Sequence, residues 1–278
     1  MRVALTIAGS DSGAGAGIQA DLKTFAAHGV YGISAITAVT AQSSLGVTRA
    51  DPMQADLVTA QLEAVVSDFG AHAVKTGMLA NAAIVEAVAA AVQALELPYL
   101  VVDPVIVSSS GDPLLDDEGV MALKKELVGL AHAVTPNIPE AEVLSGISIR
   151  SEQDLREAAR RLFALGPGHV VITGGHRPSI SNTSSDGPSD RIVDVVYDGD
   201  VFTEYVTDRV AGRHTHGTGC TYAAAITAHL ALGRSLHEAV PLAQMYVAGA
   251  IRHAPQLGAG SGPINHFWRL DIDKAGRL

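Results

Sequence analysis

Apolar and polar positions along the chain follow two periodicities in turn. Short apolar runs, typical of buried strands, alternate with stretches whose apolar residues recur at helical spacing. The predicted strands are 3–8, 33–40, 73–75, 99–102, 132–135 and 170–173. The predicted helices are 18–28, 52–69, 81–95, 117–128, 219–232 and 235–254. A further helix is predicted to start with a capping box at Ser151 and Asp154. Repeated strand–helix units of this length predict an α/β fold with a mainly parallel sheet and helices on both faces.

Two regions depart from this alternation. The stretch 177–190 is rich in Ser, Pro, Gly and Asp, which predicts a surface loop. Residues 192–197 and 201–206 flank Asp-Gly-Asp at 198–200, a pattern that predicts a β-hairpin. We find no internal repeat and no composition shift typical of a linker. Residues 1–278 are therefore interpreted as a single domain.

Composition narrows the classes of partner. Of the 278 residues, 47% are hydrophobic and only 4% aromatic, so we expect a large aliphatic core. The formal net charge of −10 argues against broad contacts with nucleic acid or an anionic membrane. A single cysteine excludes an intrachain disulfide, and no uncharged run reaches membrane-spanning length. We expect a cytoplasmic protein that binds any phosphate locally, through backbone N–H groups, a metal ion or a few basic side chains.

Glycine-rich and polar residues gather where the predicted strands end. In an open parallel sheet, ligands bind beyond the carboxyl ends of the strands, so these residues predict a site at one edge. The sharpest pattern is Thr-His-Gly-Thr-Gly-Cys-Thr at 215–221, directly before an alanine-rich helix. Glycines there let backbone N–H groups converge at a helix N-terminus and form an anion hole. As an isolated motif, it is equally compatible with a helix start that binds nothing.

Other motifs are excluded by their spacing. The glycines at 13–17 follow G-x-G-x-G rather than a dinucleotide fingerprint, and no acidic residue ends the second predicted strand. The chain contains no P-loop motif. His216 and Cys220 are spaced i, i+4, but two further soft ligands for zinc are lacking, and a Cys-His protease pair is disfavoured.

The acidic candidates are Asp21, Asp103 and Glu140. Asp103 follows a predicted buried strand and precedes a proline, so its carboxylate should stand at the sheet edge. There it could bind Mg²⁺ or cap a local turn. Asn137 and Glu140 lie at a predicted helix start, where capping is the simpler interpretation without the surrounding pattern.

Taken together and in order, these motifs resemble hydroxymethylpyrimidine/phosphomethylpyrimidine kinases of thiamin biosynthesis, in the ribokinase-like superfamily. The matching segments are residues 8–11, 15–25, 38–42, 75–79, 103–105, 110–112, 135–142, 174–176, 216–221 and 262–267. The resemblance implies a three-layer αβα sandwich with a small β-hairpin near the nucleotide site. It also implies two phosphoryl transfers from ATP with Mg²⁺, first to 4-amino-5-hydroxymethyl-2-methylpyrimidine and then to its monophosphate, and a homodimer.

The resemblance also assigns roles to residues. Those implied to bind the pyrimidine are Gly9, Asp21, Gln42, Met78 and Val105. Those implied to contact the nucleotide are Asn137, Thr173 and His216, and those implied for Mg²⁺ are Asp103 and Glu140. Those implied for the anion hole and catalysis are Gly217, Thr218, Gly219 and Cys220.

Cys220 stands where ribokinase-like sugar kinases have an aspartate as general base. A helix N-terminus lowers the pKa of a thiol, so we expect partial thiolate at neutral pH. The second transfer needs a base less, since its nucleophile is a phosphate oxygen that is already largely ionised.

The chain departs from the family pattern at two positions, where Ser109 and Thr173 replace lysines that the family often has. The nearest alternative is a pyridoxal/pyridoxine kinase of the same superfamily, which Gln42 and Met78 disfavour. A catalytically silent nucleotide- or vitamin-binding protein is a second alternative. A sugar kinase is disfavoured by the cysteine at 220.

Overall fold

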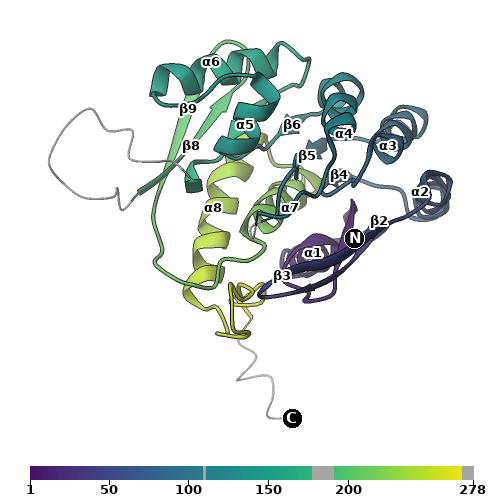
Figure 1. Cartoon of the computed structure of the whole chain (residues 1–278), viewed down its shortest axis with the longest axis horizontal. Coiled ribbons are helices and arrows are strands. Elements are labelled where there is room, and N and C mark those ends of the chain that lie inside the picture. Colours follow the sequence, from purple (N-terminus) through teal and green to yellow (C-terminus); the bar gives the residue numbers. More distant parts are fainter. Residues whose placement is uncertain (109–110, 177–190, 271–278) are drawn as a thin grey trace, which may run out of the picture.

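One sheet runs through the molecule. The computed structural model describes residues 1–108, 111–176 and 191–270. Within them, strands pair in the order β3-β2-β1-β4-β5-β6-β7-β8-β9 (Figure 1). Neighbours from β2 to β7 run parallel, and the outer pairs β2–β3, β7–β8 and β8–β9 run antiparallel. The strands are β1 (Val3–Asp11), β2 (Tyr31–Ser43), β3 (Gly46–Pro52), β4 (Ala73–Thr76), β5 (Leu100–Val102), β6 (Ala133–Val134), β7 (Val170–Ile172), β8 (Arg191–Tyr197) and β9 (Phe202–Asp208).

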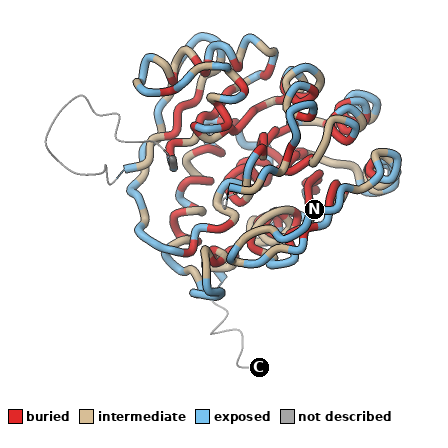
Figure 2. The backbone as a smooth tube through the Cα atoms, viewed as in Figure 1, coloured by how far each residue is buried: buried red, intermediate tan, exposed pale blue. Residues whose placement is uncertain are grey.

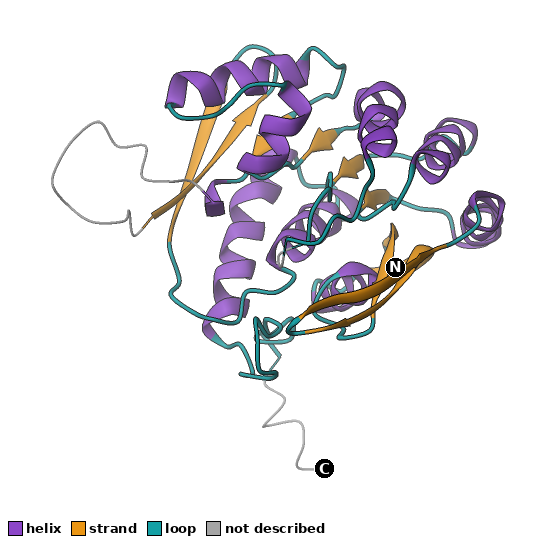
Figure 3. Ribbon diagram, in the orientation of Figure 1, coloured by secondary structure: helices purple, strands orange, loops and turns teal. Residues whose placement is uncertain are grey.

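Helices cover both faces of this sheet (Figure 3). One face carries α2 (Ala55–Phe69), α3 (Ala82–Ala94), α4 (Asp117–Ala122), α5 (Ile138–Ser145) and α6 (Glu152–Phe163). The other face carries α1 (Gly17–Ala27), α7 (Thr218–Ala231) and α8 (Leu236–Arg252). The chain continues from α4 through a π turn (Leu123–Leu127) and a 3-10 turn (Val128–Leu130), and a further 3-10 turn (Gly174–His176) follows β7. No helix in the described ranges is long and apolar enough to span a bilayer.

The strands separate two hydrophobic cores, seen as red segments between the layers in Figure 2. Along β1, Leu5 and Ile7 face one core while Ala4 faces the other, as the two-residue period of a strand requires. The core under α7 and α8 is rich in alanine, which lets these helices approach the sheet closely. The predicted three-layer αβα sandwich with a mainly parallel sheet is confirmed.

The two edges of the sheet differ in how well the sequence predicts them. The hairpin is confirmed as β8 and β9, which pair from Arg191–Asp208 to Tyr197–Phe202. Strand β3 was not predicted, because an exposed edge strand buries no face and so shows no alternation of apolar residues. The predicted loop at 177–190 lies outside the described residues.

Candidate active site

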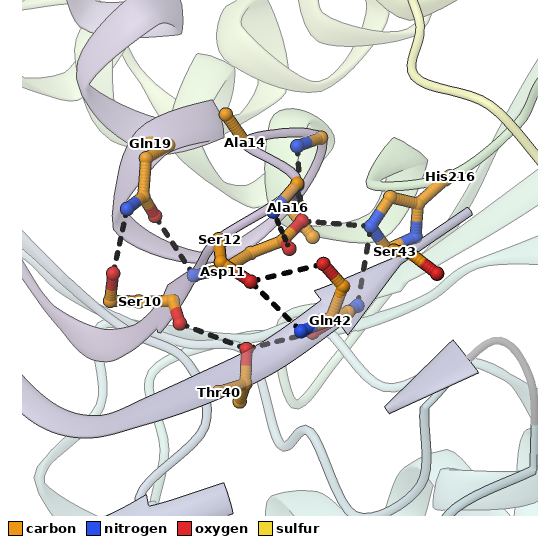
Figure 4. A network of polar contacts seen from close by, with 12 residues as sticks. Ser10, Asp11, Ser12, Ala14, Ala16, Gln19, Thr40, Gln42, Ser43 and His216 are labelled. Carbon is orange, nitrogen blue, oxygen red and sulfur yellow. Dashed lines mark hydrogen bonds and ion pairs between the residues drawn. The ribbon is translucent and has the colours of Figure 1, made fainter. Parts of the chain in front are cut away.

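The loop after β1 wraps around the carboxylate of Asp11, which is buried. Oδ1 of Asp11 accepts the N–H of Gly13 at 2.8 Å, and Oδ2 accepts those of Gly15 and Ala16 at 3.0 and 2.8 Å (Figure 4). Burial raises the pKa of this carboxyl, but hydrogen bonds from His216, Ala16 and Gly13 outweigh it, so the net pKa is lowered. The glycines at 13–17 therefore close on an internal anion.

His216 joins this loop to the segment before α7. Its Nε2 lies 2.9 Å from Oδ2 of Asp11 and 3.3 Å from Nε2 of Gln42 (Figure 4). The ring is buried against the position of Gly15, so no Cβ could fit there. Its Nε2 therefore links two loops, and the predicted contact of His216 with the nucleotide stays a prediction.

Gln42 lies at the end of β2, beside both loops. Its Oε1 accepts the hydroxyl of Thr40 at 3.1 Å, and its backbone N–H donates to Ser12. The side chain is partly exposed, so the amide can reach a ligand. Gln42 therefore stands next to His216, which immediately precedes the predicted anion loop.

Three of the other residues predicted for the pyrimidine also lie at this edge. Gly9 and Met78 face each other, since a Cβ on Gly9 would lie 3.0 Å from the sulfur of Met78. Val105 is partly exposed just after β5, and its N–H donates to the carbonyl of Asp103. The structure thus brings Gly9, Met78 and Val105 to the ends of neighbouring strands.

Asp21, also predicted for the pyrimidine, forms a buried ion pair with Lys75. It is fully buried, and both its carboxylate oxygens accept from Nζ of Lys75, at 2.9 and 3.0 Å. The hydroxyl of Thr6 donates to the same carboxylate at 2.6 Å. Asp21 has no exposed surface here, and its role toward the pyrimidine stays a prediction.

Lys75 is a site residue to which no role was assigned from the sequence. Burial lowers its pKa, but the charge of Asp21, with that of Asp103, outweighs burial and raises it, so the ammonium stays charged. Its Nζ lies 3.6 Å from Oδ2 of Asp103. The available signal was a lysine inside the apolar strand Ala-Val-Lys-Thr, where an unpaired charge would be costly.

Asp103 and Glu140 have the character of a metal-binding pair. Oδ2 of Asp103 is buried and makes no hydrogen bond to any residue in the described ranges. Burial raises the pKa of Asp103 to about 6 despite Lys75. Burial, with the nearby charge of Asp103, raises the pKa of Glu140 to about 8. Two carboxylates at such a cost fit Mg²⁺, which proteins hold with one or two carboxylates plus phosphate oxygens and water.

Asn137 and Glu140 also form the capping box of α5. Asn137 Oδ1 accepts the N–H of Glu140, and Glu140 Oε2 accepts the N–H of Asn137, both at 2.9 Å. The simpler interpretation of these two residues is thus confirmed, and it leaves Glu140 Oε1 for other contacts. Thr173 bridges to Asn137 from the end of β7, so the structure brings these two predicted nucleotide residues together.

The predicted anion loop leads into α7. Gly217 has φ of +82°, and a Cβ there would clash with the carbonyl of Gly15, so only glycine fits. No side chain caps α7 at Gly217, and the space around Gly219 is open. At this helix start the N–H of Thr218 donates to the carbonyl of Thr215 at 3.3 Å, which leaves the N–H groups of Gly219 and Cys220 as the candidates for an anion. The anion hole stays a prediction.

Cys220 departs from the expected chemistry. Burial raises the pKa of its thiol to about 12; Asp103 and Asp21 add to this, while Lys75 and the N–H of Gly17 oppose it. The expected partial thiolate is therefore corrected to a protonated thiol in the unliganded protein. The helix N-terminus does not offset desolvation here.

A cavity of about 590 Å³ opens at the segment that precedes the anion loop in the chain. It is lined by residues 210–214, which lead directly into the loop, and by Ile251, Arg252, Ala254 and Gln256 at the end of α8. None of these residues stood out in the sequence, because they carry no motif and lie on a loop and a helix end far apart along the chain.

Comparison with known proteins identifies the family. The phosphomethylpyrimidine kinase model matches residues 11–265. The chain belongs to this family. The hydroxymethylpyrimidine/phosphomethylpyrimidine kinase of Bacillus subtilis is 46% identical over 264 residues, which cover 95% of this chain and 94% of that protein. A bifunctional thiamine biosynthesis protein of Geobacter sulfurreducens is 48% identical over 263 residues, 95% of this chain and 52% of that protein.

Solved structures agree on the fold. The pyridoxal kinase of Bacillus subtilis in an ADP complex has a TM-score of 0.86 and 38% identity, covering 98% of this chain and all of that one. The phosphomethylpyrimidine kinase of Clostridium difficile has a TM-score of 0.77 and 40% identity, covering 90% of this chain and all of that one. The kinase family thus shares its architecture with pyridoxal kinases.

Glu140→Gln is expected to change how stability depends on pH. The raised pKa of Glu140 means that the folded protein binds a proton more tightly than the unfolded chain between pH 4.5 and about 8. Its contribution is therefore complete below pH 4.5 and is lost as pH rises through 8. Glutamine keeps the capping acceptor without titrating, so the variant should gain melting temperature relative to wild type from pH 6 to pH 9.

Thermal unfolding followed by circular dichroism at several pH values measures this difference. Glu118→Gln, an exposed substitution in the first turn of α4, is the control and should run parallel to wild type over the same range. If the difference in melting temperature between Glu140→Gln and wild type stays constant from pH 6 to pH 9, the raised pKa assigned to Glu140 is contradicted.

Proposed function

We propose that this protein transfers the γ-phosphoryl group of ATP to the hydroxymethyl group of 4-amino-5-hydroxymethyl-2-methylpyrimidine, and then to the resulting monophosphate. The observation that carries the proposal is the contact between Gln42 and His216. It places an amide, which can donate and accept at once, beside the loop suited to the transferred phosphoryl group. The relatives with 46–48% identity are named for this same pair of reactions.

The cavity at the segment before the anion loop is suited to the nucleotide. Its volume falls within the usual range for small-molecule sites. Because residues 210–214 continue directly into the loop, a base and ribose held there would direct their phosphates toward Gly217–Cys220. Solved pyridoxal kinases of this fold carry ADP or AMP-PCP, which supports a nucleotide in the present chain.

Charge at the reacting phosphates is balanced by three features of the chain. Asp103 and Glu140 would hold Mg²⁺, which supplies charge neutralisation of the phosphates when bound. The N–H groups at the start of α7 face developing negative charge on the γ-phosphoryl group. Lys75, locked below by Asp21, adds a fixed positive charge.

The alcohol keeps its proton until late in this scheme and then passes it to an oxygen of the transferred phosphoryl group. As the pyrimidine oxygen bonds to phosphorus, the bond between phosphorus and the ADP oxygen breaks, with little build-up of negative charge on the nucleophile. The protonated thiol of Cys220 first hydrogen-bonds the hydroxyl and orients it. The monophosphate needs no such help, since its oxygen is already largely ionised. The homodimer expected from the family belongs to the same proposal.

Pyridoxal phosphorylation is the second candidate. It is favoured by the TM-score of 0.86 to pyridoxal kinases at 38% identity over nearly the whole chain. Gln42 and Met78 favour the aminopyrimidine instead, because that ligand presents a paired donor–acceptor edge to an amide.

The direct test measures ADP release. The protein is incubated with Mg-ATP and, separately, the aminopyrimidine alcohol, its monophosphate and pyridoxal. We expect turnover with the alcohol and the monophosphate. Turnover with pyridoxal alone overturns the proposal, and no turnover with any substrate supports a silent binding protein.

Gly212→Leu tests the nucleotide cavity. A Cβ at Gly212 would lie 3.5 Å from Ile251, an ordinary contact, so the fold should tolerate the change while the side chain fills the cavity. We expect the KM for ATP to rise at least about tenfold, roughly 1.4 kcal/mol. The KM for the pyrimidine should stay within about twofold, as expected when the loss is confined to nucleotide binding. An unchanged KM for ATP in a folded variant places the nucleotide elsewhere.

Cys220→Ser separates the two transfers. Because only the alcohol needs the orienting hydrogen bond of Cys220, the first transfer should slow by at least about tenfold more than the second. Single-turnover rates for the alcohol and the monophosphate, measured separately, decide the matter. Equal losses in both reactions contradict the assigned role.

A further inference from the structure

The segment Gly262–Phe267 follows α8 and lies against the anion loop. It is one of the motifs on which the family resemblance rests, yet the proposed phosphoryl transfer leaves it without a role. In Figure 1 it belongs to the yellow chain below α8, near the start of β3. Its contacts reach the anion loop from both sides.

The upstream flank of the loop is bound to Gly262. The N–H of Gly262 donates to Nδ1 of His214 at 3.1 Å, and the carbonyl of Gly262 accepts the N–H of His216 at 3.1 Å. A backbone N–H can only donate, so Nδ1 of His214 must carry a lone pair. Pro263 also packs beside Gly15, against the glycine loop. The path of residues 214–216 is thereby fixed.

The downstream flank is bound to His266. Thr221, the residue after Cys220, is fully buried, and its hydroxyl lies 3.0 Å from Nε2 of His266. Its N–H donates to the carbonyl of Gly217 at 2.9 Å, which closes the loop. Burial, with the nearby charge of Lys23, lowers the pKa of His266 to about 4, so its ring is neutral and suited to a hydroxyl partner.

His266 is itself held firmly by α8. The N–H of Asn265 donates to the carbonyl of Ala250 at 3.0 Å, and the hydroxyl of Tyr246 donates to the carbonyl of His266. The ring of Trp268 packs where a side chain on Gly249 would lie, and its Nε1 donates to the carbonyl of Tyr246 at 3.1 Å. The imidazole therefore approaches Thr221 from a rigid support.

We propose that His266 is a positioning residue for phosphoryl transfer: through Thr221 it fixes the Cys220 thiol and the backbone N–H groups of residues 217–220. This inference rests on the proposed function of that loop. Since a displacement of about 1 Å can cost 100-fold in rate, one hydrogen bond next to Cys220 suffices to affect the chemistry. His266 does not touch the reacting atoms, so its loss acts on kcat rather than on substrate binding.

Kinetics of four variants test the proposal. His266→Phe keeps the ring but removes the hydrogen bond, and kcat should fall about 10- to 100-fold, with both KM values within about threefold. His266→Gln offers an amide in place of Nε2 and should recover kcat to within about fivefold of wild type. Thr221→Val should reproduce the loss, and the double variant should lose no more than either single one. Additive losses, or a kcat for His266→Phe within twofold of wild type, overturn the proposal.

Hydrogen exchange without substrate gives a second readout. In His266→Phe, amides of 217–221 should exchange faster, while those of β1 and β4 keep their wild-type rates. His237→Phe, an exposed change in the first turn of α8, is the matched control and should alter neither kinetics nor exchange at 217–221. Unchanged exchange at 217–221, or an increase spread over the whole protein, overturns the proposal. If wild type phosphorylates no substrate, the proposed function fails while exchange still decides the role of His266.

Discussion

The buried ion pair of Lys75 and Asp21 is the constraint on which the rest of the site depends. Two charges without solvent access are tolerated only when paired and hydrogen-bonded, and here both oxygens of Asp21 accept from Lys75 while Thr6 adds a third bond. The pair ties β1, β4 and α1 together directly beneath the carboxyl ends of the strands. It leaves Oδ2 of Asp103 3.6 Å from the ammonium and, among the described residues, without a hydrogen bond, which suits the metal ion of the proposed function.

Negative charge at this edge is thus only partly compensated. Glu140 keeps a high pKa because it is buried close to Asp103, and Cys220 stays protonated for related reasons. In a protein with a net charge of −10, nucleotide phosphates can enter only where backbone N–H groups, Lys75 and a divalent cation together outweigh the carboxylates. Under the proposed function, this charge balance favours a metal–nucleotide complex over free phosphate.

Much of the fold can be predicted from the sequence, because the spacing of apolar residues distinguishes buried strands from helices. This spacing missed β3, whose edge position leaves no buried face to detect. Within the site, residue types were easier to predict than their surroundings. Asp21 and His216 were expected to face ligands, but their partners Lys75 and Asp11 lie 54 and 205 positions away along the chain. Tertiary packing alone decides which way such side chains turn. The same is true of the Cys220 pKa, since desolvation depends on neighbours that no local pattern reveals.

The carboxylate of Asp11 has a consequence for selectivity among anions. Two glycine-rich turns face the same edge of the sheet, and both could in principle bind a phosphate. The carboxylate of Asp11 occupies the first turn, where it is bound by three backbone N–H groups and by His216. An incoming phosphoryl group would have to displace the Asp11 carboxylate at the first turn. At the second turn no carboxylate of the described residues occupies the N–H groups. Under the proposed function, this difference directs the phosphoryl group to the second turn, although both turns are rich in glycine.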